Sequence, residues 1–265
     1  MDILSIEMAY RSPMACTCAC ARIDICKGYR NRKLYGYAMP IISIANPKGG
    51  AGKTTLAFIL ADQLSSNGAS VAVVDADPNA IIAKWHERRT AEGRASPFTV
   101  IAKPSEGAMI NTVDQLAKEY QFVIVDLEGT ASRMTSRAFA RSHLVLVPFN
   151  QSPIDAELAA NAVQLIHEES EALQRPLPFR LVRSRDSSAV TTKSSKRIAT
   201  AIAEANLPVL AVGLVERAAY RDIFDFSKTL SELESDTTSG LENARGNAAK
   251  LAASVIEAIR EEYPQ

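Results

Sequence analysis

Cysteine is absent from all but the start of the chain, and this absence limits what the rest of the protein can be. The four cysteines are Cys16, Cys18, Cys20 and Cys26. The remainder of the sequence therefore cannot form a fold held together by disulfides. It also cannot bind an iron–sulfur cluster through cysteine thiolates, which excludes a cluster-dependent reductase for the main part of the chain.

Long apolar runs and an excess of charge of either sign are also lacking. No stretch approaches the roughly 18–20 consecutive apolar residues of a transmembrane helix, and the N-terminus lacks the pattern of a signal peptide. We therefore expect a cytoplasmic protein without a membrane anchor. Lys and Arg total 30, as do Asp and Glu, so the formal net charge is zero. Any contact with nucleic acid must then come from a local basic patch.

The first 38 residues differ from all that follow. They combine polar, basic and cysteine residues without a sustained period, whereas a short apolar run typical of a buried strand begins at Met39. We expect residues 1–38 to be a disordered N-terminal extension and residues 39–265 to form the folded domain. The cysteine cluster could instead bind a soft metal such as Zn²⁺, although its spacing matches none of the usual zinc patterns.

From Met39 onward, strand-like and helix-like segments alternate. Apolar runs predict strands at 41–45, 70–75, 98–101, 122–126, 143–148, 179–183 and 209–214. Helical patterns lie between and after them, at 53–67, 79–92, 107–119, 131–140, 153–173, 191–206 and 240–262. This alternation predicts an α/β fold, doubly wound, with a mostly parallel sheet and helices on both faces.

A glycine-rich segment joins the first predicted strand to the first predicted helix. It reads Lys48, Gly49, Gly50, Ala51, Gly52, Lys53, Thr54 and Thr55. Glycines let the backbone approach a phosphate closely, and N–H groups at a helix N-terminus attract anions. Lys53 is expected to reach the β- and γ-phosphates, Thr54 to ligate Mg²⁺, and Thr55 to lie toward the α-phosphate.

This loop departs from the general phosphate-loop pattern, because Pro47 stands where a glycine is usual and Lys48 precedes the first glycine. In this form it resembles the ParA/MinD family of deviant Walker A P-loop ATPases, over about residues 39–262. The resemblance implies ATP and Mg²⁺ as ligands, ATP hydrolysis, and a homodimer that encloses ATP. It also implies that Lys48 crosses the dimer interface to the ATP of the partner protomer, much as arginine fingers do elsewhere. There it would act together with Lys53 of that protomer.

Acidic residues follow two predicted strands. Asp75 and Asp77 resemble the family's switch I segment, with Asn79 in place of the usual glutamine. The resemblance assigns Asp77 to orienting the attacking water and Asp75 to supporting Mg²⁺. The alternative is that either carboxylate only caps the next helix.

Asp126 ends a further apolar strand, as a Walker B aspartate does, and is expected to hold Mg²⁺ directly or through water. The family usually continues with two prolines, whereas Glu128 and Gly129 follow here after a leucine. We interpret Glu128 as a loop charge, although a second carboxylate near the attacking water is the alternative.

Two segments resemble the small plasmid-partition ParA proteins and their T-DNA-transfer relative, namely 152–155 and 207–220. The resemblance implies positioning or segregation of DNA, and a ParB-like DNA-binding partner that stimulates hydrolysis. Residues 1–38 are too few for the DNA-binding N-terminal domain of longer ParA proteins.

Two alternatives stay open within the same fold, a MinD-like positioning ATPase at the membrane and an ATP-dependent ligase. The last predicted helix has one apolar stripe but ends in Glu261 and Glu262, the wrong charge for an anionic membrane. We therefore interpret it as a helix that packs on the core. The additional lysine, Lys48, favours a dimerising switch over a ligase.

Basic residues in two places are candidates for DNA contact without sequence preference. The candidates are Lys193, Lys196, Arg197, Arg217 and Arg221. The first three share one face of a predicted helix, and the two arginines follow the last predicted strand, where ParA-like proteins carry DNA-binding arginines. The alternative is a solvated helix face and a structural arginine.

Overall fold

The computed structural model describes residues 39–264, except for 130, 131, 151 and 187–192. The expected extension at 1–38, with its cysteines, therefore lies outside the described residues.

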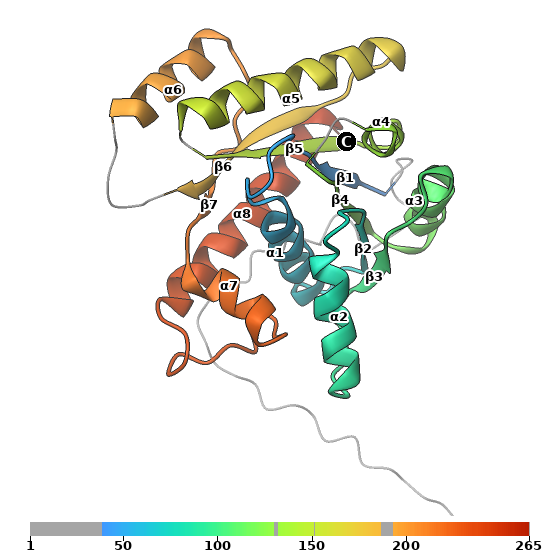
Figure 1. Cartoon of the computed structure of the whole chain (residues 1–265), viewed down its shortest axis with the longest axis vertical. Coiled ribbons are helices and arrows are strands. Elements are labelled where there is room, and N and C mark those ends of the chain that lie inside the picture. Colours follow the sequence, from blue (N-terminus) through green and yellow to red (C-terminus); the bar gives the residue numbers. More distant parts are fainter. Residues whose placement is uncertain (1–38, 130–131, 151, 187–192, 265) are drawn as a thin grey trace, which may run out of the picture.

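A seven-stranded sheet forms the centre of the domain (Figure 1). Its strands are β1 (Ile41–Ile44), β2 (Val71–Asp75), β3 (Thr99–Ala102), β4 (Phe122–Asp126), β5 (Leu144–Phe149), β6 (Phe179–Asp186) and β7 (Leu214–Val215). They lie in the order β3-β2-β4-β1-β5-β6-β7, and every neighbouring pair is parallel. The chain runs from β1 to β2 and β3 on one side, returns to β4 between β2 and β1, and then continues through β5, β6 and β7 on the other side. This reversal beside β1 places the loop after β1 at the crevice where such sheets bind ligands.

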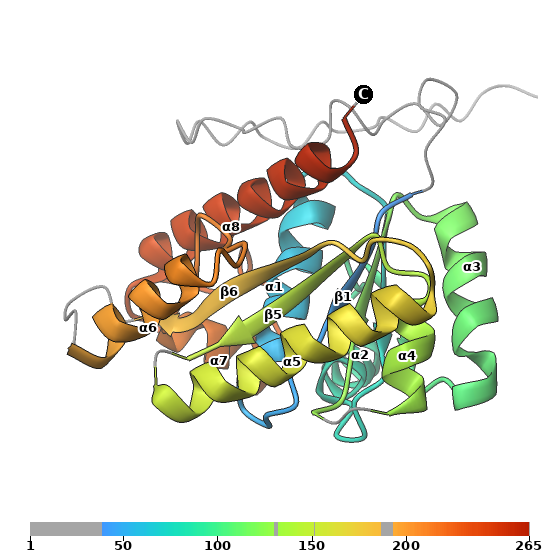
Figure 2. The ribbon, with the colours of Figure 1, turned by 90° about the horizontal axis from the view of Figure 1, so that it is seen from above.

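Helices cover both faces of this sheet (Figures 1 and 2). One face carries α1 (Lys53–Ser66), α2 (Ile81–Ala91), α7 (Ala218–Asp225) and α8 (Leu241–Glu262). The other carries α3 (Met109–Glu119), which follows the short 3-10 turn η1 (Glu106–Ala108), together with α4 (Arg133–Phe139), α5 (Pro153–Ala172) and α6 (Lys193–Glu204). The expected doubly wound α/β class is confirmed, with a sheet that is parallel throughout rather than mostly parallel.

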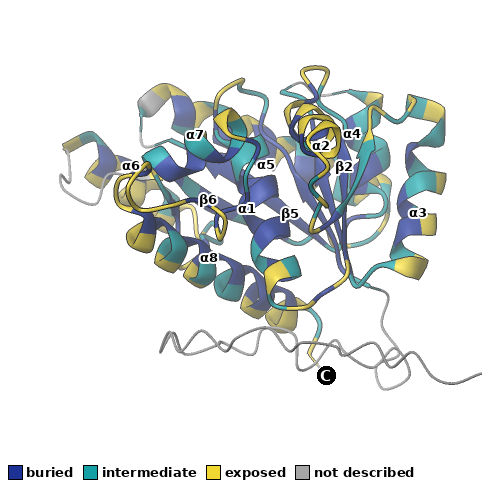
Figure 3. Cartoon of the chain, turned by 90° about the horizontal axis from the view of Figure 1, so that it is seen from below, coloured by how far each residue is buried: buried dark blue, intermediate teal, exposed yellow. Residues whose placement is uncertain are grey.

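The core consists of two apolar layers separated by the sheet. Alternate residues of β1 contribute to different layers: Ile42 and Ile44 pack with α1 and α8, whereas Ile41 packs on the opposite side. Figure 3 shows buried residues along the strands and α1, with exposed residues on the outer sides of α2, α3 and α8. Strands covered on both faces need apolar residues at successive positions, which explains their unbroken hydrophobic runs.

The last helix packs on the core, as its apolar stripe predicts. Leu241, Leu251, Val255 and Ile259 of α8 are buried against the same layer as α1. Within the described part of the chain, every helix is too short or too polar to cross a lipid bilayer.

The last strand and the helix after it differ from expectation. The apolar run at 209–214 was expected to be a strand, but β7 contains only Leu214–Val215, and Val209 makes one isolated bridge to Leu181. Leu210 is buried in the core instead of pairing in a ladder. The short helix α7 was not predicted.

Candidate functional site

The glycine-rich loop lies between β1 and the N-terminus of α1, in the context that a phosphate-binding loop requires. Gly50 and Gly52 have φ values of 77° and 93°, which residues with a Cβ rarely adopt. A Cβ atom at Gly52 would also overlap Oγ of Ser184 at the end of β6. The N–H groups that open α1 therefore face a space that no side chain of the loop fills, and such a space suits an anion.

A pocket of about 390 Å³ opens over this loop. It is lined by Gly49, Gly50, Gly52, Lys53, Thr54, Thr55, Asp77, Pro78, Asn79, Ile81, Glu128, Gly129 and Arg185. Residues expected to bind phosphate thus share one pocket with the switch I residue Asp77. Glu128, which the sequence suggested was a loop charge, lies on the wall of the same pocket.

Lys53 is buried at the floor of this pocket. Its ammonium group donates to the backbone carbonyls of Asn46 at 3.2 Å and Lys48 at 3.0 Å. Burial lowers the pKa of Lys53, while the carboxylates of Asp126 and Asp77 act in the opposite direction. A Cβ atom at Gly129 would lie 3.3 Å from Nζ of Lys53. The glycine that replaces the family's proline after β4 therefore leaves room for this lysine.

Asp75 and Asp126 stand side by side at the ends of β2 and β4, where the strand register pairs them. Asp126 is fully buried, and neither of its carboxylate oxygens has a hydrogen-bond partner of good geometry among the described residues. Burial raises the pKa of Asp126 to about 8, and the nearby Thr54 hydroxyl lowers it only in part. Burial also raises the pKa of Asp75, partly offset by the N–H of Ala83, which donates to Oδ2 at 2.9 Å.

This arrangement fits Mg²⁺. A buried carboxylate without a partner is costly unless a cation approaches it, and the Thr54 hydroxyl and Asp75 supply further oxygens nearby. The described residues contain no group of three or more His, Cys, Asp or Glu side chains that could hold a metal ion alone. Mg²⁺ usually combines one or two protein carboxylates with substrate phosphates and water, so a site of few carboxylates beside a phosphate loop suits it.

The capping alternative for the switch I residues applies to Asp75 rather than to Asp77. The carboxylate of Asp75 accepts the N–H of Ala83 in the first turn of α2. Asp77 accepts the N–H of Asn79 at 2.8 Å in a local turn and lines the pocket. Asp77 is therefore placed to contact a ligand, while Asp75, beside Asp126, is hydrogen-bonded to the first turn of α2.

Lys48 points away from the pocket toward the N-terminus of α5. Its ammonium group lies 2.7 Å from Oδ1 of Asp155, and its backbone N–H donates to Oδ1 of Asn46 at 2.7 Å. Burial would raise the pKa of Asp155, but hydrogen bonds from Lys48 and Ser152 outweigh it and hold that pKa below its ordinary value. The resemblance assigns Lys48 to the ATP of a partner protomer, whereas here Lys48 is ion-paired with a residue of its own chain.

A second pocket of about 240 Å³ continues from the first along Gly52 and Thr55. The ends of β6 and β7 and the start of α7 form its walls. Oγ of Ser184 and Nε of Arg217 line it and have no hydrogen-bond partner among the described residues. Arg185, on the walls of both pockets, has a φ of 51° at an irregularity in the pairing of β6 with β7. A bulge of this kind redirects a side chain, here toward the junction of the pockets.

The five candidate DNA-contact residues do not form one cluster. Lys193, Lys196 and Arg197 are exposed on α6, on the sheet face that α5 also covers. Arg217 is half-buried, and exposed Arg221 lies 3.9 Å from Glu216, both at α7 on the opposite face (Figure 1). The structure therefore divides the set into an α6 group and an α7 pair.

Several residues around the site carry no signal in the sequence. Asn46, Ser184 and Arg185 belong to no spacing pattern and meet the phosphate loop only through the fold. Asp155 belongs to the segment 152–155 that resembles partition proteins, but the sequence did not indicate its contact with Lys48. Gly129 is the exception, because its position directly after the Walker B strand could have suggested close approach to the loop.

Comparison with known proteins agrees with this geometry. The model of the VirC1 protein family matches residues 39–258. The protein ParA of Rhizobium radiobacter is 34% identical over 225 residues, which are 84% of this chain and 100% of that relative. Protein virC1 of Rhizobium rhizogenes is 26% identical over 184 residues, 69% of this chain and 79% of that protein. The structure of apo McdA from Cyanthece shares the fold with a TM-score of 0.66 at 17% identity, covering 82% of this chain and 99% of that one.

The family match spans most of the chain, and the glycine-rich loop lies between β1 and α1 with Asp75 and Asp126 at the ends of neighbouring strands. The chain belongs to the VirC1 family, within the ParA/MinD family of P-loop ATPases.

Proposed function

We propose that this protein is an Mg²⁺-dependent ATPase that dimerises with ATP and uses this cycle to position or segregate DNA, as in plasmid partition. One observation carries the proposal: Lys53, Thr54 and Asp77 line a single phosphate-loop pocket, and the buried carboxylate of Asp126 interacts with Lys53 and Thr54. The likeness to a relative named ParA over that protein's whole length supports partition as the task.

Different residues bind the nucleotide, hold Mg²⁺ and orient the attacking water. The loop N–H groups and Lys53 bind the phosphates of ATP, and the second pocket accepts the nucleoside beside Ser184 and Arg217. Thr54, Asp75 and Asp126 hold Mg²⁺, which when bound offsets the negative charge of the phosphates. Asp77 orients the attacking water from the wall of the pocket.

Dimerisation completes the site. Lys48 leaves Asp155 and reaches the ATP of the partner protomer, adding a positive charge where the transferring phosphoryl group needs it. A dimer also brings two copies of each basic group together. DNA affinity then depends on ATP, since paired protomers contact about twice as many phosphates.

DNA is bound without sequence preference, through the α6 group, the α7 pair or both, and a ParB-like partner stimulates hydrolysis. The protein acts in the cytoplasm on the nucleoid. The α6 group is exposed, which supports phosphate contact, and phosphate contacts position a protein but carry no sequence information.

The test is binding of non-specific duplex DNA with ATP and Mg²⁺ at two salt concentrations. Wild type should bind at low salt and lose affinity steeply at high salt, because each neutralised phosphate releases counterions. Lys196→Ala/Arg197→Ala and Arg221→Ala test the two groups separately. Lys250→Ala, on the exposed side of α8, is the matched control and should bind as wild type does.

Absence of wild-type binding at low salt would contradict the DNA role. Sedimentation with anionic vesicles, and turnover with candidate carboxylic acids, would then test the membrane and ligase alternatives on the same preparation.

A further inference from the structure

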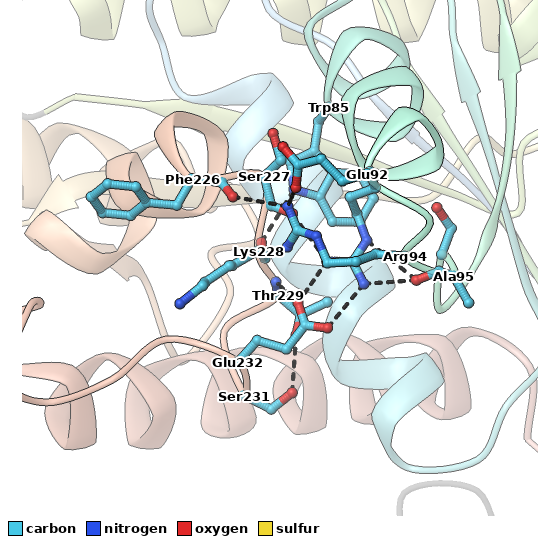
Figure 4. Close-up of polar contacts among 12 residues, drawn as sticks. Trp85, Glu92, Arg94, Ala95, Phe226, Ser227, Lys228, Thr229, Ser231 and Glu232 are labelled. Atoms are coloured by element: carbon cyan, nitrogen blue, oxygen red, sulfur yellow. Dashed lines mark hydrogen bonds and ion pairs between the residues drawn. The ribbon is translucent and has the colours of Figure 1, made fainter.

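Helix α2, which follows the switch I aspartates, is hydrogen-bonded to a distant segment of the chain, residues 224–232, which runs from the last turn of α7 into the loop before α8 (Figure 4). Side chains of α2 and of the turn after it donate hydrogen bonds to four backbone carbonyls of this segment. The bonds run from Arg88 to Phe224 at 2.6 Å, from Arg94 to Phe226 at 3.2 Å, from Arg89 to Ser227 at 3.0 Å and from Trp85 to Lys228 at 3.2 Å. These carbonyls include the end of α7, where a helix lacks internal donors and favours cations.

Arg89 is at the centre of this contact. Its side chain is 3% exposed, and its guanidinium binds both carboxylate oxygens of Glu232, at 2.6 and 2.9 Å. It also donates to the carbonyl of Ala95 at 2.7 Å and lies 5.0 Å from the ring centre of Trp85. Hydrogen bonds from Arg89 lower the pKa of Glu232 to about 2, so this pair stays ionised at neutral pH. A two-pronged pair fixes orientation as well as distance, and here its arginine is buried while Glu232 is partly open to solvent.

The other end of α2 is fixed to the metal and water sites. The carboxylate of Asp75 accepts the N–H of Ala83, and the N–H of Ala80 donates to the carbonyl of Asp77 at 2.9 Å. A change at either aspartate when nucleotide and Mg²⁺ bind therefore acts directly on the first turn of α2. The same helix carries Trp85 about one turn later and Arg89 about two turns later.

Helix α7 contributes its last turn to the segment that α2 binds. It begins after Arg217 on the wall of the second pocket, and its last carbonyls are among those that α2 binds. The chain of contacts thus runs from the switch I aspartates through α2 and residues 224–232 to the arginines at α7.

We propose that Arg89 is a positioning residue that makes α2 and residues 224–232 one unit, so that the nucleotide state at Asp75 and Asp77 is transmitted to α7 and its arginines. The proposal rests on nucleotide binding at the phosphate loop, as inferred above. Arg89 lines neither of the two pockets. It acts through α2, a continuous element with contacts at both ends.

Hydrogen exchange tests this without relying on DNA. In the wild-type chain, a non-hydrolysable ATP analogue with Mg²⁺ should slow exchange of the amides at 224–232 at least about fivefold, the lower end of ordinary coupling between sites. In Arg89→Lys, which keeps the charge but loses the two-pronged geometry, this slowing should disappear while the analogue still binds.

The matched control is Arg245→Lys. Arg245 of α8 binds the same segment, donating to the carbonyls of Leu230 and Ser231, both at 3.2 Å, and none of its hydrogen bonds among the described residues goes to α2. Arg245→Lys should speed exchange of the amides at 224–232 without abolishing the slowing that the analogue causes. Trp85→Phe, which removes the indole donor together with part of the buried ring, is a second variant in case Arg89→Lys does not fold, and it should reduce the slowing in part.

Full slowing in folded Arg89→Lys, or in Trp85→Phe if Arg89→Lys does not fold, would overturn the inference. The inference would also be overturned if Arg245→Lys lost the slowing of exchange as fully as Arg89→Lys does. A wild-type chain that binds the analogue without any change in exchange at 224–232 would overturn it too. A wild-type chain that does not bind the analogue at all would instead overturn the proposed nucleotide function, and with it this inference. In DNA binding, Arg89→Lys should bring the ATP-to-ADP affinity ratio toward one.

Discussion

Lys53 and Asp77 line the same pocket but act at different stages of the proposed reaction. Lys53 is buried against the loop carbonyls, where a phosphate oxygen can replace them. Asp77 accepts the N–H of Asn79 in a local turn, and it acts on Lys53 through its charge rather than through a hydrogen bond among the described residues. Lys53 therefore contributes to binding of the ground state, whereas Asp77 contributes mainly to the transition state.

The first prediction separates these roles. Asp77→Ala should bind ATP with nearly unchanged affinity and lose roughly a hundredfold or more in turnover, as expected for loss of general-base assistance. Lys53→Ala should bind ATP poorly. Nucleotide affinity and turnover of both variants are the measurements, and normal turnover in Asp77→Ala would refute the switch I role.

Asp155 holds Lys48 within its own protomer, so this ion pair opposes transfer of the lysine to a partner. Lys48 is 35% exposed, and solvent screening limits such a pair to on the order of 1 kcal/mol. In Asp155→Asn, the ATP concentration needed for half-maximal dimerisation should fall roughly threefold to fivefold.

Ser152→Ala is the matched control for Asp155→Asn. It removes the hydroxyl that caps α5 but leaves Asp155 ionised beside Lys48. Light scattering across an ATP titration measures both variants. An Asp155→Asn chain that needs as much ATP as wild type would show that the pair does not restrain Lys48.

At this scale the sequence predicted the phosphate-loop residues and the strand-end aspartates, because each belongs to a short local pattern. It could not predict Asp155, which lies 107 positions from Lys48. It also missed Ser184, because a lone serine in a strand has no pattern that indicates a ligand. Contacts across such distances depend on strand order, and spacing does not encode that order.

Among the elements, α1 carries an acidic residue into the core. Asp62 is 3% exposed and accepts the N–H of Leu230 at 3.3 Å. Leu230 belongs to residues 224–232, the segment that α2 binds. Burial raises the pKa of Asp62 to about 6. Between about pH 4 and pH 6 the folded chain binds more protons at this site than the unfolded chain does, so its contribution to stability falls as pH rises.

The third prediction follows from this loss of stability at Asp62 as pH rises. Asp62→Asn should be more stable than wild type at neutral pH, by at most roughly 3 kcal/mol for a shift of about two pKa units. The difference should shrink as pH falls toward 4, where Asp62 is protonated in both states. Unfolding midpoints from pH 4 to 7.5 measure it, and a difference that does not depend on pH would contradict the shifted pKa.

Long elements with a clear period were predictable, and short elements at the edge of the sheet were not. The α8 stripe and the buried strands follow directly from the sequence. Helix α7 has only eight residues, and its buried positions Ala219, Tyr220 and Ile223 are too few to establish a period. The apolar run before β7 is buried by packing at Leu210, which a hydrophobic pattern cannot distinguish from strand pairing.

At the scale of the whole molecule, the described core is built from residues after the extension. Pro40 and Ile41 are buried where β1 begins, and the site uses residues from 46 onward. Deletion of residues 1–38 should therefore leave the melting temperature and ATP turnover unchanged within error. A large loss of either, or a stabilising effect of Zn²⁺ seen only in the full chain, would show a structural role for the extension.

The central claim is that two protomers close around ATP through Lys48. The most direct measurement is the mass by light scattering with saturating ATP and Mg²⁺, for Asp77→Ala and for Asp77→Ala/Lys48→Ala, since the first change prevents hydrolysis during the measurement. The account predicts a dimer for Asp77→Ala, and a monomer for the double variant although it still binds ATP. A monomer in both, or an equally stable dimer in both, would contradict it.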